Sequence, residues 1–224
     1  SSNSGSYNAI QFSNSVSGVS TTNRITISGG WDASNSMATQ YDGGYTAVSG
    51  INNRGYLWYF TSCNYADISN LIGSCGYNGM YFNSCQYGSF MNIGGTGGYY
   101  GLNFNSCDYY RDMLIWGSYG QQRAINFSSN DSGNSSGTID YDVGYGRSMF
   151  GYGGYNCIRL EYAKYGKNRW DRIEAYGAMQ YNLYTYDSYS LRIERLNHGR
   201  WPGGGPSGTS FYPNRSTGTS IGIC

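Results

Sequence analysis

Apolar residues two positions apart, with small or polar residues around them, recur along the chain. The clearest examples are Trp58/Phe60, Met80/Phe82 and Leu102/Phe104. Because successive side chains of a β-strand point to opposite faces, this alternation predicts short strands with one buried face. The same pairing recurs outside this block, at Ile10/Phe12, Ile125/Phe127, Ile158/Leu160 and Tyr181/Leu183.

These strands repeat at a constant interval between residues 55 and 118. A fixed period of this kind is typical of proteins that stack one structural unit on the next. Five sets of like residues keep the same register, namely Phe60/Phe82/Phe104, Ser62/Ser84/Ser106, Cys63/Cys85/Cys107, Tyr65/Tyr87/Tyr109 and Gly73/Gly95/Gly117. The repeat therefore predicts coils of about 22 residues in which like residues stack on like.

Each coil holds further short strands, which follow the first pair within the same repeat. We expect them at Ile25/Ile27, Ile68/Leu71, Phe90/Ile93, Leu114/Trp116, Ile139/Tyr141/Val143, Ile173 and Leu191/Ile193. Strands this short at this spacing cannot form hairpins, but each can pair in parallel with its counterpart one coil later, ~4.8 Å away. The sequence thus predicts an all-β protein, a parallel β-solenoid.

Irregular intervals divide the predicted solenoid. We assign residues 1–196 to about eight or nine coils, with one weaker coil near Met37 and an insertion near Gly144–Gly154, whose glycines suit an excursion. Residues 197–224 hold all three prolines and a run of three glycines. We expect this tail to be an irregular cap or extended arm that covers the last open edge.

Composition narrows the functional classes. The chain has 35 Gly and 26 Tyr, and its 17% aromatic content is too high for a disordered chain. Its net charge of +1 gives no electrostatic case for a nucleic-acid partner. No apolar stretch approaches the ~20 residues that span a bilayer, so we expect no membrane insertion.

The six cysteines do not have the spacing of a metal site or a disulfide framework. No Cys-x-x-Cys occurs and His198 is the only histidine, so zinc-ligand spacing is absent. We expect Cys63, Cys85 and Cys107 to form an inward column of reduced thiols, because parallel stacked Cβ atoms at ~4.8 Å are too far apart for a relaxed disulfide. We expect no metal and no cofactor.

The stacked apolar pairs, the Ser-Cys and Asn-Ser columns and the constant repeat interval resemble the right-handed parallel β-helix of the pectate-lyase-like superfamily. The Tyr-, Gly-, Asn- and Ser-rich composition resembles the shafts of viral tailspikes and tail fibres. The resemblance covers residues 7–196. It implies a single-stranded right-handed β-helix, glycan binding at a cell surface, polysaccharide cleavage in some members, and frequent trimers. Fold alone assigns none of these functions to this chain.

Two pairs of carboxylates are candidates for polysaccharide cleavage, which needs a general acid and a base ~6.5–9.5 Å apart for inversion. Asp140 and Asp142 flank Tyr141, and on a strand they would point outward about 6.5–7 Å apart. Glu174 and Glu194 lie in matching Arg-Ile-Glu triplets and would stack if their coils are in register. The alternative is structural: Arg172 and Arg192 would pair with the glutamates, and the aspartates would keep a strand soluble.

Tyrosine gives the clearer indication of function. A buried Tyr hydroxyl needs a partner, so many of the 26 are expected on the surface. Such aromatic columns suit sugar rings, contact with an identical subunit, or simple stabilisation of the solenoid. The candidate ligand-binding residues are Tyr65, Tyr87, Tyr109, Tyr77 and Tyr99, together with Arg147, Phe150 and Tyr152.

Three functional hypotheses follow. The first is a structural and receptor-binding module of a viral tail fibre, tailspike or surface adhesin, located on a virion tail or outside the cell. Its partners would be a cell-surface polysaccharide or glycan and further copies of itself, in a homotrimer. The second is a polysaccharide depolymerase, a glycoside hydrolase or lyase, and the third is a purely structural shaft.

Overall fold

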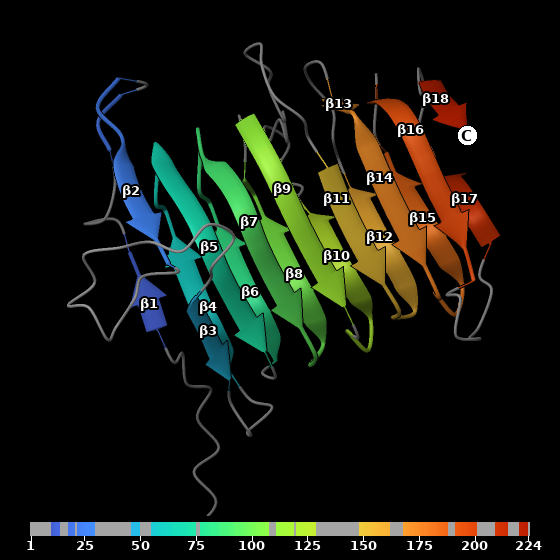
Figure 1. Ribbon diagram of the computed structural model, residues 1–224, viewed down its shortest axis with the longest axis horizontal. Helices are drawn as coiled ribbons and strands as arrows, with labels where there is room; N and C mark the ends of the chain where they lie inside the picture. The colour runs from blue at the N-terminus through green and yellow to red at the C-terminus, as the bar shows by residue number, and fades with distance from the viewer. Residues whose placement is uncertain are drawn as a thin grey trace, which may run out of the picture.

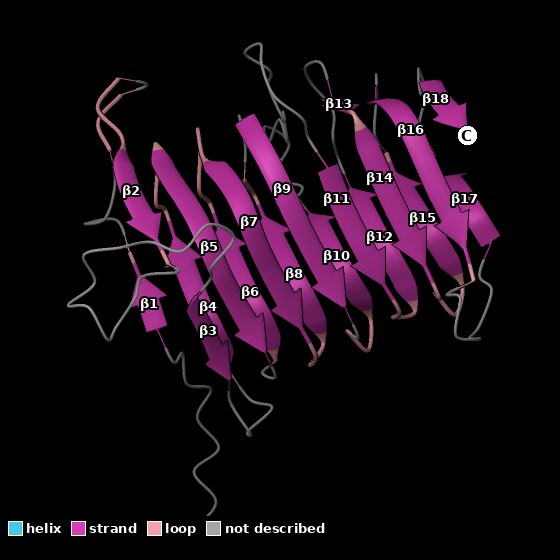
Figure 2. Cartoon of the chain, viewed as in Figure 1, coloured by secondary structure: helices cyan, strands magenta, loops and turns pink. Residues whose placement is uncertain are grey.

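The computed structural model of the protein describes residues 10–13, 18–20, 22–29, 46–49, 55–74, 77–107, 111–118, 120–128, 148–161, 168–187, 191–200, 209–214 and 220–223. These residues form strands joined by turns, and no helix occurs among them (Figure 2). The strands lie in one sheet of eight and one of ten, and their pairings are parallel. The prediction of an all-β protein with parallel strands is confirmed.

The eight-stranded sheet is called the first sheet. Its strands, in spatial order, are β1 (Ile10–Phe12), β4 (Tyr56–Thr61), β6 (Asn78–Asn83), β8 (Tyr100–Asn105), β10 (Arg123–Ser128), β12 (Asn156–Glu161), β15 (Tyr181–Tyr186) and β17 (Thr209–Asn214). Spatial order follows chain order throughout this sheet. Each strand therefore pairs with the next strand of its sheet along the chain, as in a stack of coils.

The ten-stranded sheet is called the second sheet. Its spatial order is β13 (Asn168–Trp170), β16 (Leu191–Gly199), β14 (Arg172–Tyr176), β11 (Ser148–Tyr152), β9 (Arg111–Ser118), β7 (Ser89–Thr96), β5 (Ala66–Ser74) and β2 (Ile25–Ser28). In addition, β3 (Thr46–Ser49) pairs with β5 and β18 (Ser220–Ile223) pairs with β16. From β4 to β12 the chain alternates between the sheets, and Figure 1 shows successive strands following one another along the long axis. This arrangement fits the class of parallel β-solenoids.

The core between the sheets is built on a stack of phenylalanines from the first sheet. Ring centroids lie 5.0 Å apart for Phe12–Phe60, 4.8 Å for Phe60–Phe82 and 4.7 Å for Phe82–Phe104. Phe127 continues the stack, 4.5 Å from Phe104. The predicted apolar pairs thus point inward, since Phe60, Phe82 and Phe104 are at most 1% exposed.

The predicted cysteine column also lies inside. Cys63, Cys85 and Cys107 are buried and each is a free thiol. The Sγ of Cys85 donates to the carbonyl of Phe60 at 3.6 Å, and that of Cys107 donates to the carbonyl of Asn105 at 3.2 Å. Hydrogen bonding to the two neighbouring thiols, with burial, raises the pKa of Cys85 well above its usual value. Cys85, at the centre of the column, therefore acts as small apolar packing rather than as a reactive thiolate.

The glycine column of the repeat has a steric origin. Gly95 pairs with Gly73 on one side and Gly117 on the other. A Cβ atom on Gly95 would lie 2.0 Å from the carbonyl oxygen of Gly101, at the start of β8. Here the end of a second-sheet strand passes against the backbone of the first sheet, so this column excludes larger side chains.

Two asparagines explain why the inward residues of the second sheet are three apart in the repeat. Asn70 and Asn92 have φ values of 56° and 55°, within strands β5 and β7. Each adds one residue between inward side chains, as a β-bulge does. Asn92 Nδ2 donates to Asn70 Oδ1 at 2.9 Å, so the irregularity stacks coil on coil.

The bulge also corrects one predicted pair. Leu114 and Trp116 were predicted as the apolar pair of this strand, but the buried apolar side chains described in β9 are Met113 and Ile115. The register shifts where β9 pairs with β7, beside the bulge. Trp116 therefore lies on the outer face, where its indole occupies the space that a Cβ on Gly94 would need.

Part of the range predicted as an insertion, Gly144–Gly154, belongs to the second sheet. Residues 148–152 form β11, whose Gly151 pairs with Gly117 and continues the glycine column. Residues 144–147 of the predicted insertion lie outside the described residues. Gly151 meets a packing requirement of the sheet and does not mark a loop.

Strand pairing also bears on the coil predicted near Met37 and on the predicted pair Tyr181/Leu183. The weaker coil expected near Met37 lies outside the described residues; among the described strands, Phe12 of β1 pairs directly with Phe60 of β4. In β15, Ile158 pairs with Leu183 and Leu160 with Thr185. The inward pair of β15 is therefore Leu183 and Thr185, and not Tyr181 and Leu183 as predicted. Thr185 is polar but fully buried, so the hydrophobic pattern does not identify it as an inward residue.

The tail is more regular than predicted. Residues 209–214 continue the first sheet as β17, and residues 220–223 continue the second as β18. Pro213 is accommodated because β17 is the last strand in the order of its sheet, and an edge strand tolerates the missing N–H. An irregular arm is therefore the wrong description of these two segments.

Candidate functional site

The outer face of the first sheet carries one uninterrupted column of paired residues, one from each strand. Because side chains alternate along a strand, these residues point away from the phenylalanine stack. The column, from β1 to β17, consists of Gln11, Tyr59, Tyr81, Asn103, Asn126, Arg159, Tyr184 and Tyr212. Tyrosines thus lie towards both ends of the face, and amides and an arginine occupy its centre.

Six tyrosines form one connected group on β4, β6 and β8 and the turns before β6 and β8, which we call the tyrosine cluster. Its members are Tyr56, Tyr59, Tyr77, Tyr81, Tyr99 and Tyr100. Tyr56 stacks on Tyr59 at 5.2 Å and on Tyr81 at 4.7 Å. The cluster therefore extends both along a strand and across strands.

The exposed edge of the tyrosine cluster lies at the turns. Tyr77 is 41% exposed, and its ring stacks on that of Tyr99 at 5.0 Å. Towards the sheet, burial raises the pKa of Tyr81 to about 12, and the hydroxyls of Tyr56 and Tyr59 add to this effect. Near neutral pH Tyr81 is thus an uncharged ring with a hydroxyl donor.

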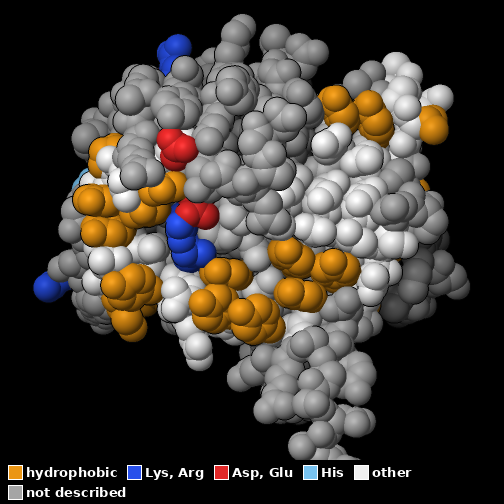
Figure 3. All heavy atoms as spheres, turned by 180° about the vertical axis from the view of Figure 1, so that it is seen from behind, with side chains coloured by type: hydrophobic (Ala, Val, Ile, Leu, Met, Phe, Trp, Pro, Cys, Tyr) orange, Lys and Arg blue, Asp and Glu red, His pale blue; other side chains and the backbone are white. Residues whose placement is uncertain are grey.

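A smaller aromatic group lies at the other end of the face. The ring centroid of Tyr181 lies 5.6 Å from that of Tyr184 and 4.6 Å from that of Tyr212, and the centroids of Tyr184 and Tyr212 are 5.7 Å apart. The guanidinium of Arg159 lies over the ring of Tyr184, 5.1 Å from its centroid, and Arg159 also pairs with Glu161. Figure 3, the view from behind Figure 1, shows separate groups of hydrophobic-coloured side chains with adjacent basic and acidic side chains among them.

A ladder of amides lies between the two aromatic groups. Asn126 Nδ2 donates to Asn103 Oδ1 at 2.8 Å, and Asn105 Nδ2 donates to Asn83 Oδ1 at 2.9 Å. Asn103 and Asn126 are 7% and 2% exposed. Since they are buried and hydrogen-bonded, they stabilise the sheet and position neighbouring groups rather than contact a ligand.

Arg123, on β10, lies at the border of the tyrosine cluster. Its Nη1 donates to the hydroxyl of Tyr100 at 3.0 Å and to Asn126 Oδ1 at 3.2 Å. Its guanidinium also lies 5.3 Å from the centroid of the Tyr100 ring. Burial lowers the pKa of Arg123, which nevertheless remains a cation near neutral pH.

The structure brings only some of the predicted ligand-binding residues together. Tyr77 and Tyr99 belong to the tyrosine cluster. Tyr65 and Tyr87 stack on each other at 4.6 Å, but in the turns from the first sheet to the second. Tyr109 lies outside the described residues. The predicted tyrosine columns therefore form two separate surfaces where described.

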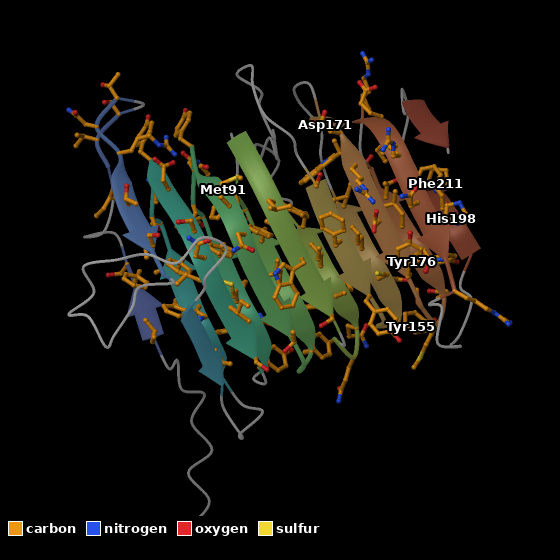
Figure 4. The ribbon with its side chains drawn as sticks, in the orientation of Figure 1. Met91, Tyr155, Asp171, Tyr176, His198 and Phe211 are labelled. Carbon is orange, nitrogen blue, oxygen red and sulfur yellow. The ribbon has the colours of Figure 1, made fainter. Side chains whose placement is uncertain are left out.

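The residues predicted around the insertion lie on the second sheet. Phe150 and Tyr152 belong to β11, and the guanidinium of Arg172 lies 5.7 Å from the centroid of the Phe150 ring. Arg147 falls outside the described residues. Figure 4 shows Met91 and Tyr176, which also come from strands of the second sheet. Phe150 and Tyr152 thus do not contribute to the tyrosine cluster.

The candidate catalytic carboxylates are not brought together among the described residues. Glu174 pairs in register with Asn197, whose Nδ2 donates to Glu174 Oε1 at 3.3 Å. The expected stacking of Glu174 on Glu194 is therefore wrong, because β14 pairs with the second half of β16. Each glutamate instead forms an ion pair along its own strand, Glu174 with Arg172 and Glu194 with Arg192. Asp140 and Asp142 lie outside the described residues.

Sequence reasoning missed Tyr56, Tyr59, Tyr81, Tyr100 and Arg123. Tyr59 and Tyr81 lie between the two members of their apolar pairs, Trp58/Phe60 and Met80/Phe82, so the alternation that assigns those pairs to the core assigns both tyrosines to the outer face. The signal was present in the same periodicity. Arg123 pairs with Tyr100 at an interval one residue longer than that of the repeat, so this contact was harder to predict from the sequence.

Comparison with known proteins gives no match to any family model, curated protein or solved structure. In the described part of the chain, no group of three or more His, Cys, Asp or Glu side chains is placed to hold a metal ion. Nor does that part contain a helix long and apolar enough to cross a bilayer.

Proposed function

We propose that the chain is a right-handed parallel β-helix, with coils of about 22 residues, that serves as a structural and receptor-binding module. It would belong to a viral tail fibre, tailspike or comparable surface adhesin, on a virion tail or outside the cell. Its ligand is a cell-surface glycan bound at the tyrosine cluster. The observation that carries the proposal is the six-tyrosine cluster on the outer face of the first sheet.

The physical support is the amphipathic character of tyrosine. A ring presents a flat apolar surface that packs on the C–H faces of a sugar, and its hydroxyl exchanges hydrogen bonds with sugar hydroxyls. Stacking holds the rings of Tyr56, Tyr59 and Tyr81 in place, so little side-chain entropy is lost on binding. A rigid aromatic surface of this kind favours recognition over a purely structural role.

The proposal is tested by binding purified protein to an array of bacterial capsule and O-antigen polysaccharides and other surface glycans. We expect the double substitution Tyr59→Ala/Tyr81→Ala to weaken binding of the best ligand at least tenfold, about 1.4 kcal/mol. The matched control is Tyr176→Ala on the second sheet, which removes a half-buried tyrosine away from the cluster and should leave affinity unchanged.

Equal affinities for the wild type and the double variant would contradict the assignment of the glycan to this cluster. Following polymer length in the same samples separates binding from cleavage. Shortening that Asp140→Asn abolishes would favour the depolymerase hypothesis. Absence of both binding and cleavage would leave the structural shaft.

The proposal also includes self-association, as a homotrimer. Its support is the set of exposed apolar side chains away from the tyrosine cluster, among them Val19 at 79% and Met179 at 69%. Surface of this kind is enriched where subunits meet. Sedimentation equilibrium of the purified chain decides the matter, and a mass equal to one chain would rule the trimer out.

A further inference from the structure

Arg123 differs from the other arginines whose contacts are described. Arg24 pairs with Asp67 at 2.7 Å, and Arg159, Arg172 and Arg192 each pair with a glutamate two residues further along the strand. Arg123 forms no such ion pair within the described chain. Its hydrogen bonds go to a phenol and an amide, both neutral.

The environment of Arg123 leaves its charge poorly compensated. The Nε atom is buried and has no hydrogen-bond partner among the described residues. Both protein hydrogen bonds use Nη1, so Nη2 makes none within that part of the chain. Holding a partly desolvated cation beside neutral partners is unfavourable unless an anion from outside supplies the missing charge.

The distribution of charged residues over the first sheet also favours an anionic ligand at Arg123. Among the eight strands of the first sheet the only charged residues are Arg123, Arg159 and Glu161. Arg159 and Glu161 neutralise each other, which leaves one positive charge, at the border of the tyrosine cluster. An anion bound there would meet no carboxylate on these strands other than one already paired.

We propose that Arg123 binds an anionic substituent of the glycan, a carboxylate or a sulfate, on a sugar whose ring packs against Tyr100 and its neighbours in the tyrosine cluster. The inference rests on the proposed glycan-binding function and names its ligand class as acidic glycans. A guanidinium suits both groups, because it can donate two parallel hydrogen bonds to two oxygens of the same anion. Tyr100 and Asn126 hold the guanidinium in place, so it is oriented before the ligand arrives.

The experiment uses acidic polysaccharides beside their neutralised forms. Hyaluronan, chondroitin sulfate and a uronic-acid capsule polysaccharide are each compared with the carboxyl-reduced polymer and, for chondroitin sulfate, with the desulfated polymer. We expect the wild type to bind the acidic member of a pair at least tenfold more tightly. In Arg123→Gln this preference should disappear, so that the ratio of the affinities for the acidic and the neutralised polymer falls to about one.

Two further variants separate charge from geometry. Arg192→Gln removes the same charge from the second sheet and should preserve the preference, because its side chain is 61% exposed and remote from the cluster in the strand order. Arg123→Lys keeps the charge but loses the planar donor pair, so an intermediate preference is expected. The two derivatives of chondroitin sulfate show which anion is bound.

The outcomes distinguish this inference from the function on which it rests. If neutralised polymers bind the wild type as tightly as acidic ones, Arg123 is not an anion site, while the glycan-binding function stands. If Arg123→Gln keeps the preference, the anion binds elsewhere and the inference is likewise overturned. If no polymer of the panel and no neutral glycan binds, both proposals fail.

Discussion

Replacing Phe104 by alanine is expected to lower the free energy of unfolding by about 4 kcal/mol, the range for deleting a fully buried aromatic ring. Phe104 is 1% exposed and lies in the middle of the phenylalanine stack, between Phe82 at 4.7 Å and Phe127 at 4.5 Å. It also meets Phe90 of the second sheet edge-on at 5.4 Å. Urea unfolding followed by circular dichroism measures the loss.

The matched control for this change is Met91→Ala. Met91 is 38% exposed on the second sheet, so its truncation creates no cavity and should alter stability by no more than about 0.5 kcal/mol. A loss for Phe104→Ala as small as that for Met91→Ala would mean that Phe104 does not pack between two sheets. The described core would then be incorrect.

The second large loss of stability is expected from adding a single methyl group at Gly95. We expect Gly95→Ala to cost at least about 3 kcal/mol, at the upper end for overpacking, because the clash is with backbone. The new Cβ would lie 2.0 Å from the carbonyl oxygen of Gly101 and 2.9 Å from Leu102 Cδ2. The first contact can be relieved only by moving the two sheets apart locally. Thermal and urea unfolding of the purified variant measure the cost.

The same column provides the control for this prediction. Ala175 pairs with Gly151 and is fully buried, so the position tolerates a methyl group at that level of the stack. We expect Ala175→Gly to cost only about 1 kcal/mol, the backbone effect of glycine in a strand. If Gly95→Ala is no more costly than Ala175→Gly, the close approach of the sheets at Gly95 is contradicted.

Much of the fold could be predicted because one physical signal repeats without interruption. Stacking places Phe60, Phe82 and Phe104 in register, and the alternation around them identifies the inward face. The buried cysteine column follows from the same interval. Local periodicity and repeat length agree in this block, so the sequence determines strand, register and face together.

The predictions failed where hydrophobic pattern does not determine register. The bulge at Asn92 shifts the inward residues of the next strand, and the buried Thr185 takes a place that a hydrophobic scale assigns to the surface. Gly151 was assigned to a loop because glycine usually marks one. A glycine is needed at position 151 because the two sheets approach closely there, and this approach depends on tertiary structure.

The candidate site could be predicted only in part. Tyr77 and Tyr99 were found because they repeat at the same interval, and the structure stacks them. Tyr56, which stacks on two rings of its neighbours, has Asn78 as its paired residue in the next strand and so appears in no repeated column. Contacts between different columns arise from side-chain size and direction, which an interval does not record.

The central claim is that the tyrosine cluster on the first sheet is the glycan-binding surface. Hydroxyl-radical footprinting of the protein, with and without saturating amounts of the best array ligand, tests it most directly. Protection is predicted at Tyr59, Tyr77 and Tyr81, with oxidation of Met91 and Trp116 on the second sheet unchanged. Protection of Met91 and Trp116 with none in the tyrosine cluster would contradict the account.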